Sequence, residues 1–211
     1  MRMKNLFATL LLSLAVCTAA TAQNPVTAFA ESVKGRCVKA EYTFVYKSGG
    51  IPVNGSGSLS FQGSAFCLSG NGLRIICDGS TRWTVDEESK ECYIETVEST
   101  SPDYEQNPAL LLTALDKAFS TPPAAKASNL AGHSTTSVAL TPLKGNTYLK
   151  GVTAHFLSDG SLYALVVTLK DGGVTTVTLK NLKKEKPVSL SPAFTLDIST
   201  LDSSYVITDL R

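Results

Sequence analysis

The sequence contains few of the residues that build catalytic centres. Only two of its 211 residues are histidines, and it has no H-E-x-x-H, GxxxxGK or G-x-S-x-G motif. His133 lies among Gly, Ser and Thr residues, and His155 stands beside Phe156, where a neutral structural histidine is expected. We therefore expect a protein that is not an enzyme, with no catalytic residues, no metal and no cofactor.

The sequence also lacks an excess of charge of either sign. It has 19 Lys and Arg against 18 Asp and Glu, and 18% of its residues are charged. Removal of Arg2 and Lys4 with a leader would leave 17 basic residues (19 minus 2) against 18 acidic ones. Phosphate binding needs a basic surface, so nucleic acid is not expected as a partner. The lysines between Lys180 and Lys186 are expected to form a solvated loop or strand edge.

Residues 1–22 have the pattern of a secretory signal peptide. Arg2 and Lys4 precede an apolar core from Leu6 to Val16, and Ala20-Thr21-Ala22 forms an A-x-A cleavage site. The apolar core is too short to span a bilayer, and no other segment is long enough. The alternative is a lipoprotein signal with Cys17 as the lipidated residue, but Val16 is larger than that pattern favours. The pattern favours an exported periplasmic protein.

No two cysteines form a C-x-x-C pair, which leaves a thiolate metal site or a redox centre without support. Four cysteines remain in an oxidising compartment after cleavage, enough for up to two disulfides with three possible connectivities. At least one bridge is expected to join two of the last three. The candidates are Cys37, Cys67, Cys77 and Cys92.

Short strands separated by turn residues run from Gly57 to Val97. Apolar residues alternate with polar ones there, and Asn71-Gly72 and Asp78-Gly79 tolerate the positive φ of tight hairpin turns. The cleanest alternation lies just before this segment, with one face formed by Val38, Ala40, Tyr42, Phe44 and Tyr46. These patterns predict an antiparallel meander.

Helical patterns flank the meander. A short helix is expected from Asn24 to Lys34, where Pro25 stands at the start and Gly35 follows the end. A second is expected from Pro108 to Phe119, with Leu111, Leu115 and Phe119 on one face.

The remainder of the chain is expected to be mostly strand. Ser120 to Gly132 is interpreted as a loop with a helical turn around Ala124 to Leu130. In one of the strands that follow, Tyr163, Leu165, Val167 and Leu169 are expected to share a face. The strands are predicted at Ser134 to Pro142, Gly151 to Leu157, Ser161 to Lys170, Val174 to Leu182, Ala193 to Ile198 and Tyr205 to Arg211.

Together these elements resemble the LolA family, the periplasmic carriers of lipoproteins. The resemblance implies residues 23–211 as a single domain, mainly β with some α, in which an unclosed antiparallel β-barrel is covered by a helical lid. The family's lipoprotein-binding arginine is usually followed by a proline, but the stretch from Phe61 to Phe66 has neither, so that role is not assigned to Arg74 or Arg82. The matching residues are Gly57, Leu59, Phe66, Asp78, Gly79 and Trp83, followed by the helix from Pro108.

The resemblance implies a monomeric carrier whose concave face binds the acyl chains of lipoproteins or lipids, with the helix from Pro108 as a gate. Components that transport lipoproteins at the inner and outer membranes would be its partners. Two alternatives are an envelope sensor or protein-interaction module on the same fold, and an exported hydrolase, for which no nucleophile and base are evident. The expected lipid-binding residues are Val38, Tyr42, Phe44, Tyr46, Leu59, Phe61, Phe66, Leu68, Leu73, Ile75, Trp83, Leu111, Leu115 and Phe119.

Overall fold

The computed structural model of the protein describes residues 24–97, 112, 115–120, 125–143 and 148–211. The expected signal peptide, with Cys17, and the expected lid residue Leu111 lie outside these ranges. The helices are α1 (Pro25–Val33), α3 (Leu115–Ala118), α4 (Leu190–Ala193) and the 3-10 helix η1 (Ile198–Thr200). The strands are β1 (Cys37–Lys47), β2 (Val53–Gln62), β3 (Ala65–Gly70), β4 (Leu73–Cys77), β5 (Thr81–Asp86), β6 (Glu91–Thr96), β7 (Phe119–Ser120), β8 (Lys126–Leu130), β9 (His133–Pro142), β10 (Leu149–Phe156), β11 (Leu162–Leu169), β12 (Val174–Glu185) and β13 (Val206–Asp209).

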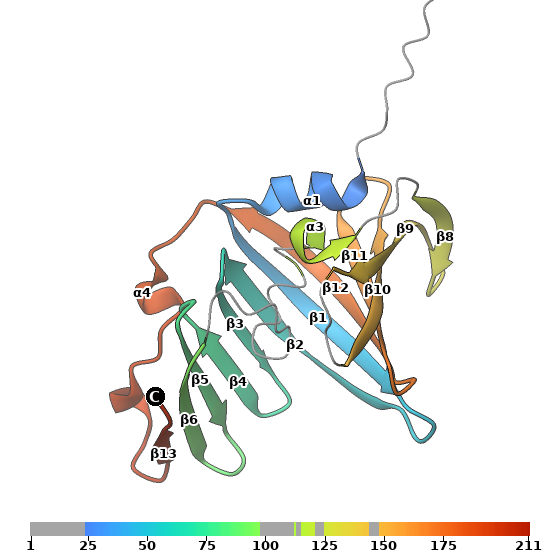
Figure 1. The fold of residues 1–211 in the computed structure, drawn as a ribbon. Helices are drawn as coiled ribbons and strands as arrows, with labels where there is room; N and C mark the ends of the chain where they lie inside the picture. Colours follow the sequence, from blue (N-terminus) through green and yellow to red (C-terminus); the bar gives the residue numbers. More distant parts are fainter. Residues whose placement is uncertain (1–23, 98–111, 113–114, 121–124, 144–147) are drawn as a thin grey trace, which may run out of the picture.

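The strands of the described ranges form one curved sheet that does not close. Its order is β13-β6-β5-β4-β3-β2-β1-β12-β11-β10-β9-β7, and β8 also pairs with β9. All pairs are antiparallel except β13 with β6. Figure 1 shows the sheet curling around α1 and α3, with β13 and β9 on opposite sides of the molecule. The predicted fold class, a half-open barrel with few helices, is confirmed.

Local sequence signals set the turns of the meander. Asn71 and Gly72 both have positive φ, as a tight hairpin turn between β3 and β4 requires. The next turn is held by Asp78, whose Oδ1 accepts hydrogen bonds from the backbone N–H groups of Ser80 and Thr81 at 2.8 Å each. At the start of the domain, Asn24 caps α1 by accepting a hydrogen bond from Val26 N. The meander strands and the first helix are therefore found where the sequence predicts them.

The segment after Ala118 differs from the prediction. Phe119 does not continue the helix but pairs with Pro142 of β9 as the first residue of β7. The predicted loop and helical turn between Ser120 and Gly132 are also wrong, because 126–130 form β8. Ala131 and Gly132, with φ of 49° and 84°, make the tight turn that folds β8 back on β9.

The C-terminal segment also differs from the prediction. The predicted strand from Ala193 to Ile198 is wrong, because α4 ends at Ala193, η1 begins at Ile198 and the residues between them form no strand. Phe194 is buried against Cys37 and Ala65, on the outer face of the sheet. The predicted final strand is confirmed as β13, which runs parallel to β6. The chain thus passes over the outer face before it joins the sheet edge.

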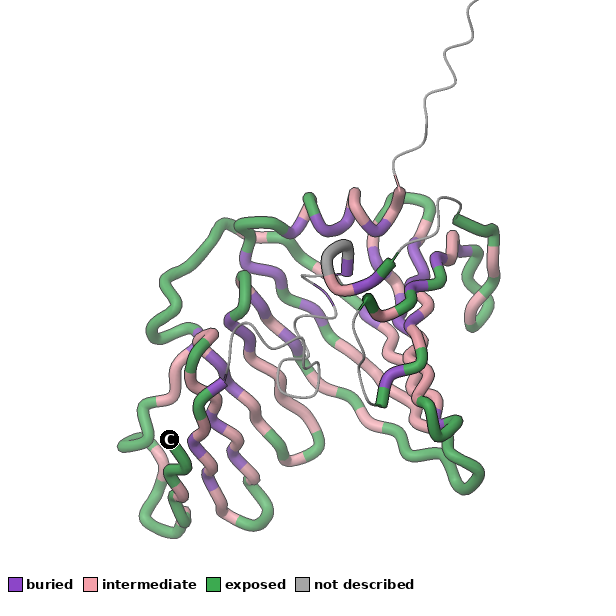
Figure 2. The backbone as a smooth tube through the Cα atoms, in the orientation of Figure 1, coloured by how far each residue is buried: buried purple, intermediate pink, exposed green. Residues whose placement is uncertain are grey.

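The apolar side chains form separate clusters on the two faces of the sheet. The inner cluster joins Phe29 of α1 and Leu115 of α3 to β1–β4 and β9–β12. The outer cluster lies on β4–β6 and is covered by Leu196, Leu201 and Tyr205. Figure 2 shows many of the buried positions beside α1 and along β5 and β6. The rest of the inner face is only half-buried, and there the sheet has room for a ligand.

Candidate functional site

Strand register brings apolar side chains of β1, β2 and β3 to the same part of the concave face. Residues opposite each other in an antiparallel pair point to the same side of the sheet. Ala40 pairs with Leu59, and Leu59 pairs with Leu68. Tyr42, two residues after Ala40, lies on the same side and pairs with Leu179 of β12. The concave face is therefore a continuous apolar surface from β12 to β3.

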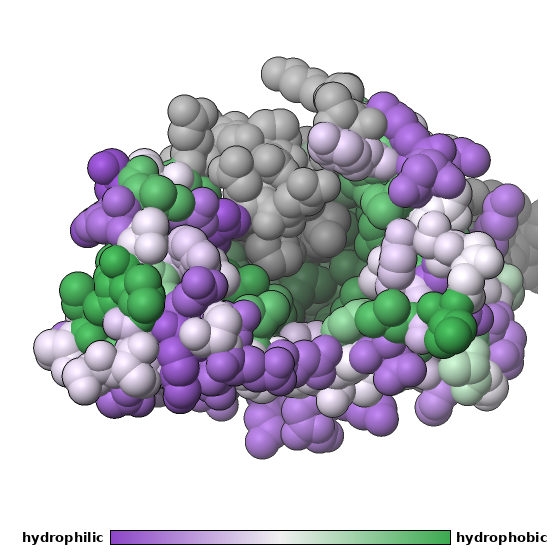
Figure 3. Space-filling view, turned by 90° about the horizontal axis from the view of Figure 1, so that it is seen from below, coloured by the Kyte–Doolittle hydropathy of each residue, from purple (hydrophilic) through white to green (hydrophobic). Residues whose placement is uncertain are grey.

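A cavity of about 280 Å³ opens on this surface. Nine of its ten lining residues are apolar or aromatic, and the remaining one is a threonine. Figure 3 shows hydrophobic side chains gathered at the wall of the hollow, seen along the sheet from below. A concave apolar site of this kind suits a hydrocarbon ligand. The lining residues are Tyr42, Phe44, Leu59, Leu68, Leu112, Leu165, Val167, Thr175, Val177 and Leu179.

Two glycines of β2 make room for the two aromatic rings of the cavity. A Cβ atom built on Gly55 would lie 2.6 Å from Phe44 Cε1, and one on Gly57 would lie 2.8 Å from the Tyr42 hydroxyl oxygen. The rings of Tyr42 and Phe44 stack with centroids 6.5 Å apart. Burial raises the pKa of Tyr42, so its phenol stays neutral at physiological pH.

Twelve of the fourteen predicted binding residues lie on the concave side of the sheet, in four groups. Four line the cavity, namely Tyr42, Phe44, Leu59 and Leu68. Five are buried in the inner cluster, which α1 and α3 cover; they are Val38, Phe61, Phe66, Leu115 and Phe119. Two lie on the concave face by register without lining the cavity: Tyr46, opposite Thr175, and Leu73, which is exposed at the end of β4. Ile75 is partly buried against the inner cluster.

Half of the cavity wall comes from β11 and β12, whose residues were not among the predicted binding residues. Leu165 pairs with Val177, and Val167 pairs with Thr175, so all four side chains face the cavity. Their alternation was visible in the sequence. Tyr163 does not share this face as expected. The pairing of β10 with β11 shifts register there, and its ring contacts His133 instead, at 4.8 Å between centroids.

The placement of Trp83 on the concave face is wrong. Trp83 pairs with Ile76 and packs with Val85, Cys92 and Ile94 in the outer cluster. The residues of β5 on the concave side are Arg82, opposite Cys77, and Thr84, opposite Ile75. Trp83 therefore fills the space between the sheet and the C-terminal segment.

The predicted disulfide is also wrong, since Cys37, Cys67, Cys77 and Cys92 are all free thiols. Cys77 lies in the inner cluster, while Cys67 and Cys92 contact the outer one, so the sheet separates them. Cys67 and Cys92 share a face, but β3 and β6 are three strand spacings apart, or about 14 Å. A disulfide needs Cα atoms within about 7 Å of each other.

The apolar surface ends at β5, where an ion pair lies on the concave face. Arg82 Nη2 and Nε lie 2.7 Å and 3.1 Å from Glu95 Oε2, and both side chains are partly buried. The concave face therefore has an apolar part from β11 to β4 and a polar part on β5 and β6.

The buried histidine has a structural environment. His155 is buried, and its Nδ1 lies 3.1 Å from Thr135 Oγ1, as expected for a structural histidine. Among the described residues, no group of three or more His, Cys, Asp or Glu side chains could hold a metal ion. No helix in the described ranges is both long enough and apolar enough to cross a membrane.

Comparison with known families matches this architecture. The profile of the family described as outer membrane lipoprotein carrier protein LolA matches residues 69–196, more than half of the chain. The chain belongs to the LolA family. The resemblance inferred from the meander residues is thereby confirmed. No curated protein matches the chain.

Solved structures show the extent of the fold similarity. An uncharacterized conserved protein from Thermus thermophilus has a TM-score of 0.53 and 6% identity, over 87% of this chain and 96% of that one. The LolA superfamily protein NE2245 from Nitrosomonas europaea has a TM-score of 0.45 and 10% identity, over 82% and 96%. LprF from Mycobacterium bovis has a TM-score of 0.43 and 14% identity, over 81% and 96%. At 6% identity, the similarity to the Thermus protein shows a shared fold and nothing more.

Proposed function

We propose that this LolA-family chain is a periplasmic carrier or binding protein for the acyl chains of lipoproteins or other lipids. The observation that carries the proposal is the cavity of about 280 Å³ on the concave face, lined almost entirely by apolar side chains. Such a cavity offers few hydrogen-bond partners to a polar substrate. It also offers no pair of groups for acid or base chemistry, which favours binding over catalysis.

The free energy for binding would come from burial of methylene groups. Each buried CH₂ contributes about 0.8 kcal/mol, so eight of them would contribute roughly 6 kcal/mol before the costs of association. Those costs offset much of this gain, so binding of a short acyl segment would be weak and reversible. Reversible binding is what a carrier requires, because it must release its cargo.

The described residues of the expected lid would have different roles. Leu112 lines the cavity, so an entering acyl chain would contact it directly. Leu115 is fully buried in the inner cluster and would hold the segment in place. Ligand entry would then shift the population of conformations at Leu112 rather than expel the whole helix.

A cavity-blocking variant tests the proposal. Val177 lines the cavity, whereas its neighbour Thr176 points to the opposite face of β12. Val177→Trp should weaken binding of a dansyl-labelled undecanoic acid at least tenfold, and the matched control Thr176→Trp should leave its Kd unchanged. Fluorescence titration with direct excitation of the dansyl group measures both. Equal affinity in the two variants, or no saturable binding to the wild type, would refute the proposed site.

Protein purified from its own cell envelope provides a second test. Native mass spectrometry should detect bound lipid or lipopeptide in the wild type and less of it in Val177→Trp. Under the same proposal the protein is a monomer and meets lipoprotein transport components at the inner and outer membranes. Protein that consistently contains no bound lipid and also fails to bind added fatty acid would instead favour an interaction module on the LolA fold.

A further inference from the structure

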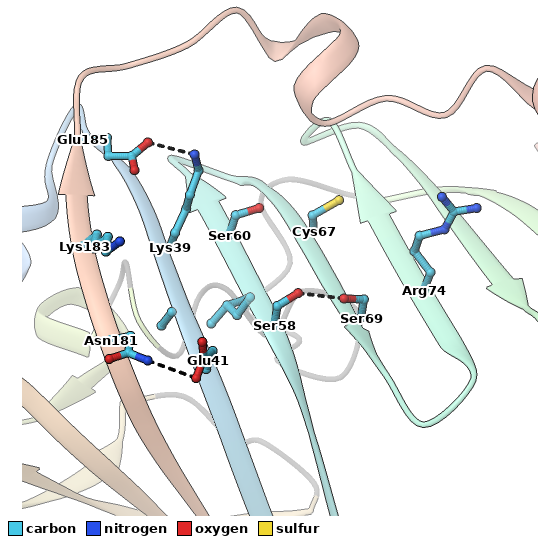
Figure 4. A pocket seen from close by; sticks show the side chains of 12 residues that line it. Lys39, Glu41, Ser58, Ser60, Cys67, Ser69, Arg74, Asn181, Lys183 and Glu185 are labelled. Atoms are coloured by element: carbon cyan, nitrogen blue, oxygen red, sulfur yellow. Dashed lines mark hydrogen bonds and ion pairs between the residues drawn. The ribbon is translucent and has the colours of Figure 1, made fainter.

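A second hollow lies on the convex face, on the other side of the sheet from the acyl cavity. It has a volume of about 580 Å³ and crosses the strands from β12 to β4. Figure 4 shows the side chains of this convex trough in order across the strands, from Lys183 and Glu185 at one end to Arg74 at the other. In contrast to the acyl cavity, its side chains are mostly polar or charged.

The trough is the part of the convex face that the C-terminal segment leaves uncovered. Gln62 fixes this segment at the end of β2, since its side chain donates to Val188 O at 2.9 Å and accepts from Val188 N at 2.8 Å. Phe194 is then buried beside Cys67. From there the chain covers β4–β6 and leaves the middle of β1–β3 open.

Strand register sets out small polar groups between the two ends of the trough. Ser58 pairs with Ser69, and Ser69 pairs with Arg74, so the three lie in one row. The hydroxyl oxygens of Ser58 and Ser69 are 2.8 Å apart. Ser60 and Cys67 form the next pair of the same two strands. The Arg74 end of the trough is therefore surrounded by hydroxyl and thiol groups.

Arg74 has a buried hydrogen-bond donor without an acceptor. Its Nε is buried and has no hydrogen-bond partner among the described residues. Arg82 and Arg211, by contrast, each contact a carboxylate, at 2.7 Å and 2.6 Å. A buried charged donor without an acceptor is destabilising, so such groups normally have one.

The carboxylates of the trough are engaged at its other end. Glu185 forms an ion pair with Lys39 at 2.8 Å, and Glu41 accepts a hydrogen bond from the Asn181 amide at 3.1 Å. Glu41 on β1 is three strand spacings from Arg74 on β4, or about 14 Å. The Arg74 end is thus electropositive. Burial raises the pKa of the Cys67 thiol, and the positive charge of Arg74 offsets part of this rise. Because Cys67 lines the trough, the electrostatic effect of Arg74 extends to the trough.

We propose that the Arg74 end of the convex trough binds an oxyanion, the phosphate or carboxylate group of a polar ligand. The guanidinium supplies a planar set of donors that matches two oxygens of such a group, and its Nε obtains the missing acceptor. The Ser60 hydroxyl can act as a further donor, and so can that of Ser69 when it accepts the hydrogen bond from Ser58. The site lies on the face opposite the acyl cavity, so this proposal can be tested independently of the proposed carrier function.

Titration with inorganic phosphate at constant ionic strength tests the site. NMR should show saturable shifts of the backbone amides of Ser60, Cys67 and Ser69, with a Kd of about 1 mM. Arg74→Gln should weaken binding at least tenfold. Arg74→Lys retains the charge but not the planar donors and should weaken it severalfold. The matched control Arg36→Gln removes an exposed charge outside the trough and should have no effect.

Further variants keep the test decisive. If Arg74→Gln does not fold, Ser69→Ala and Ser60→Ala provide the same comparison and should each weaken phosphate binding. Val177→Trp, which blocks the acyl cavity, should bind phosphate like the wild type, and this separates the two proposals. Shifts that do not saturate, or equal affinity in wild type and Arg74→Gln, would overturn the oxyanion site.

Vesicles distinguish a lipid headgroup from a soluble anion. If the phosphate belongs to a headgroup, vesicles of phosphatidylglycerol, but not of phosphatidylcholine, should sediment the wild type and not Arg74→Gln. If phosphate binds in solution and neither vesicle sediments the protein, the site takes a soluble phosphate. Acetate in place of phosphate shows whether a carboxylate is also accepted.

Discussion

The ring of Tyr42 lies over Gly57, with which it pairs across β1 and β2. A Cβ atom on Gly57 would come within 2.8 Å of the Tyr42 hydroxyl oxygen and would also clash with the carbonyl oxygen of Ser69. Without a side chain at Gly57, the Tyr42 ring can lie low against the sheet at the bottom of the acyl cavity. The glycine that marks the family resemblance thus has a steric role.

Substitution of this glycine should destabilise the sheet. Gly57→Ala forces the added methyl group into the backbone of β3, and overpacking of this kind costs about 1–3 kcal/mol or more. Urea unfolding monitored by circular dichroism measures the loss. The matched control is Gly50→Ala, because a Cβ on Gly50 meets only one atom within 4 Å, at 3.9 Å, and should change stability little. Equal stability of the two variants would contradict the steric role.

Two leucines of the expected lid should respond differently to truncation. Leu115 is fully buried in the inner cluster, so Leu115→Ala should cost about 2–5 kcal/mol of unfolding free energy. Leu112 is 5% exposed and belongs to the same cluster, but it also lines the cavity, so Leu112→Ala should cost less and should change the Kd of the dansyl fatty acid. Thermal melts and the fluorescence titration measure the two effects. A large loss at both positions, without any change in affinity, would show that Leu112 belongs to a sealed core.

Stability should depend on pH through His155. Burial lowers the pKa of His155 below the ordinary histidine value of about 6.5, because a charged imidazole is disfavoured inside the protein. The unfolded chain therefore takes up this proton first as the pH falls. The contribution of neutral His155 to stability should be complete above about pH 6.5 and should decline as the pH falls toward the pKa of His155 in the folded protein. Between about pH 7.5 and 5, the free energy of unfolding measured with urea should fall less steeply with pH in His155→Gln than in the wild type. An unchanged slope would exclude His155 as the cause.

The four thiols should react unequally. Cys37, Cys77 and Cys92 are buried and Cys67 is partly exposed, and burial raises the pKa of all four. N-ethylmaleimide should label Cys67 first in the native protein and all four in denaturant. Peptide mapping by mass spectrometry identifies the labelled sites. A bridge between any two of them in non-reduced protein would contradict the strand geometry.

Trp83 should not report on acyl binding. It is the single tryptophan and lies on the convex side, under the C-terminal segment. Adding laurate, which has no fluorescence of its own, should leave the Trp83 emission maximum unchanged while displacing the dansyl probe from the cavity. A ligand-dependent shift of Trp83 emission would indicate that binding also rearranges the outer cluster.

The sequence by itself determined the parts of the fold that depend on local chemistry. Asn71-Gly72 and Asp78-Gly79 tolerate backbone angles that most residues avoid, so they fix the hairpins of the meander. The alternation from Val38 to Phe44 fixes which side chains of β1 share a face, and these include two that line the cavity. Period-2 patterns identify a strand and its two faces without reference to the rest of the chain.

Only the tertiary structure decided which elements cover each face. The pattern of β5 places Trp83 and Val85 on one side and Arg82 and Thr84 on the other, but it does not reveal that a C-terminal segment covers the first side. The same holds for the contribution of β11 and β12 to the cavity, and for the unpartnered Nε of Arg74 beside the serines of β2 and β3. These contacts join residues far apart in the chain, so their positions depend on the curvature of the whole sheet and on the path of the segment after β12.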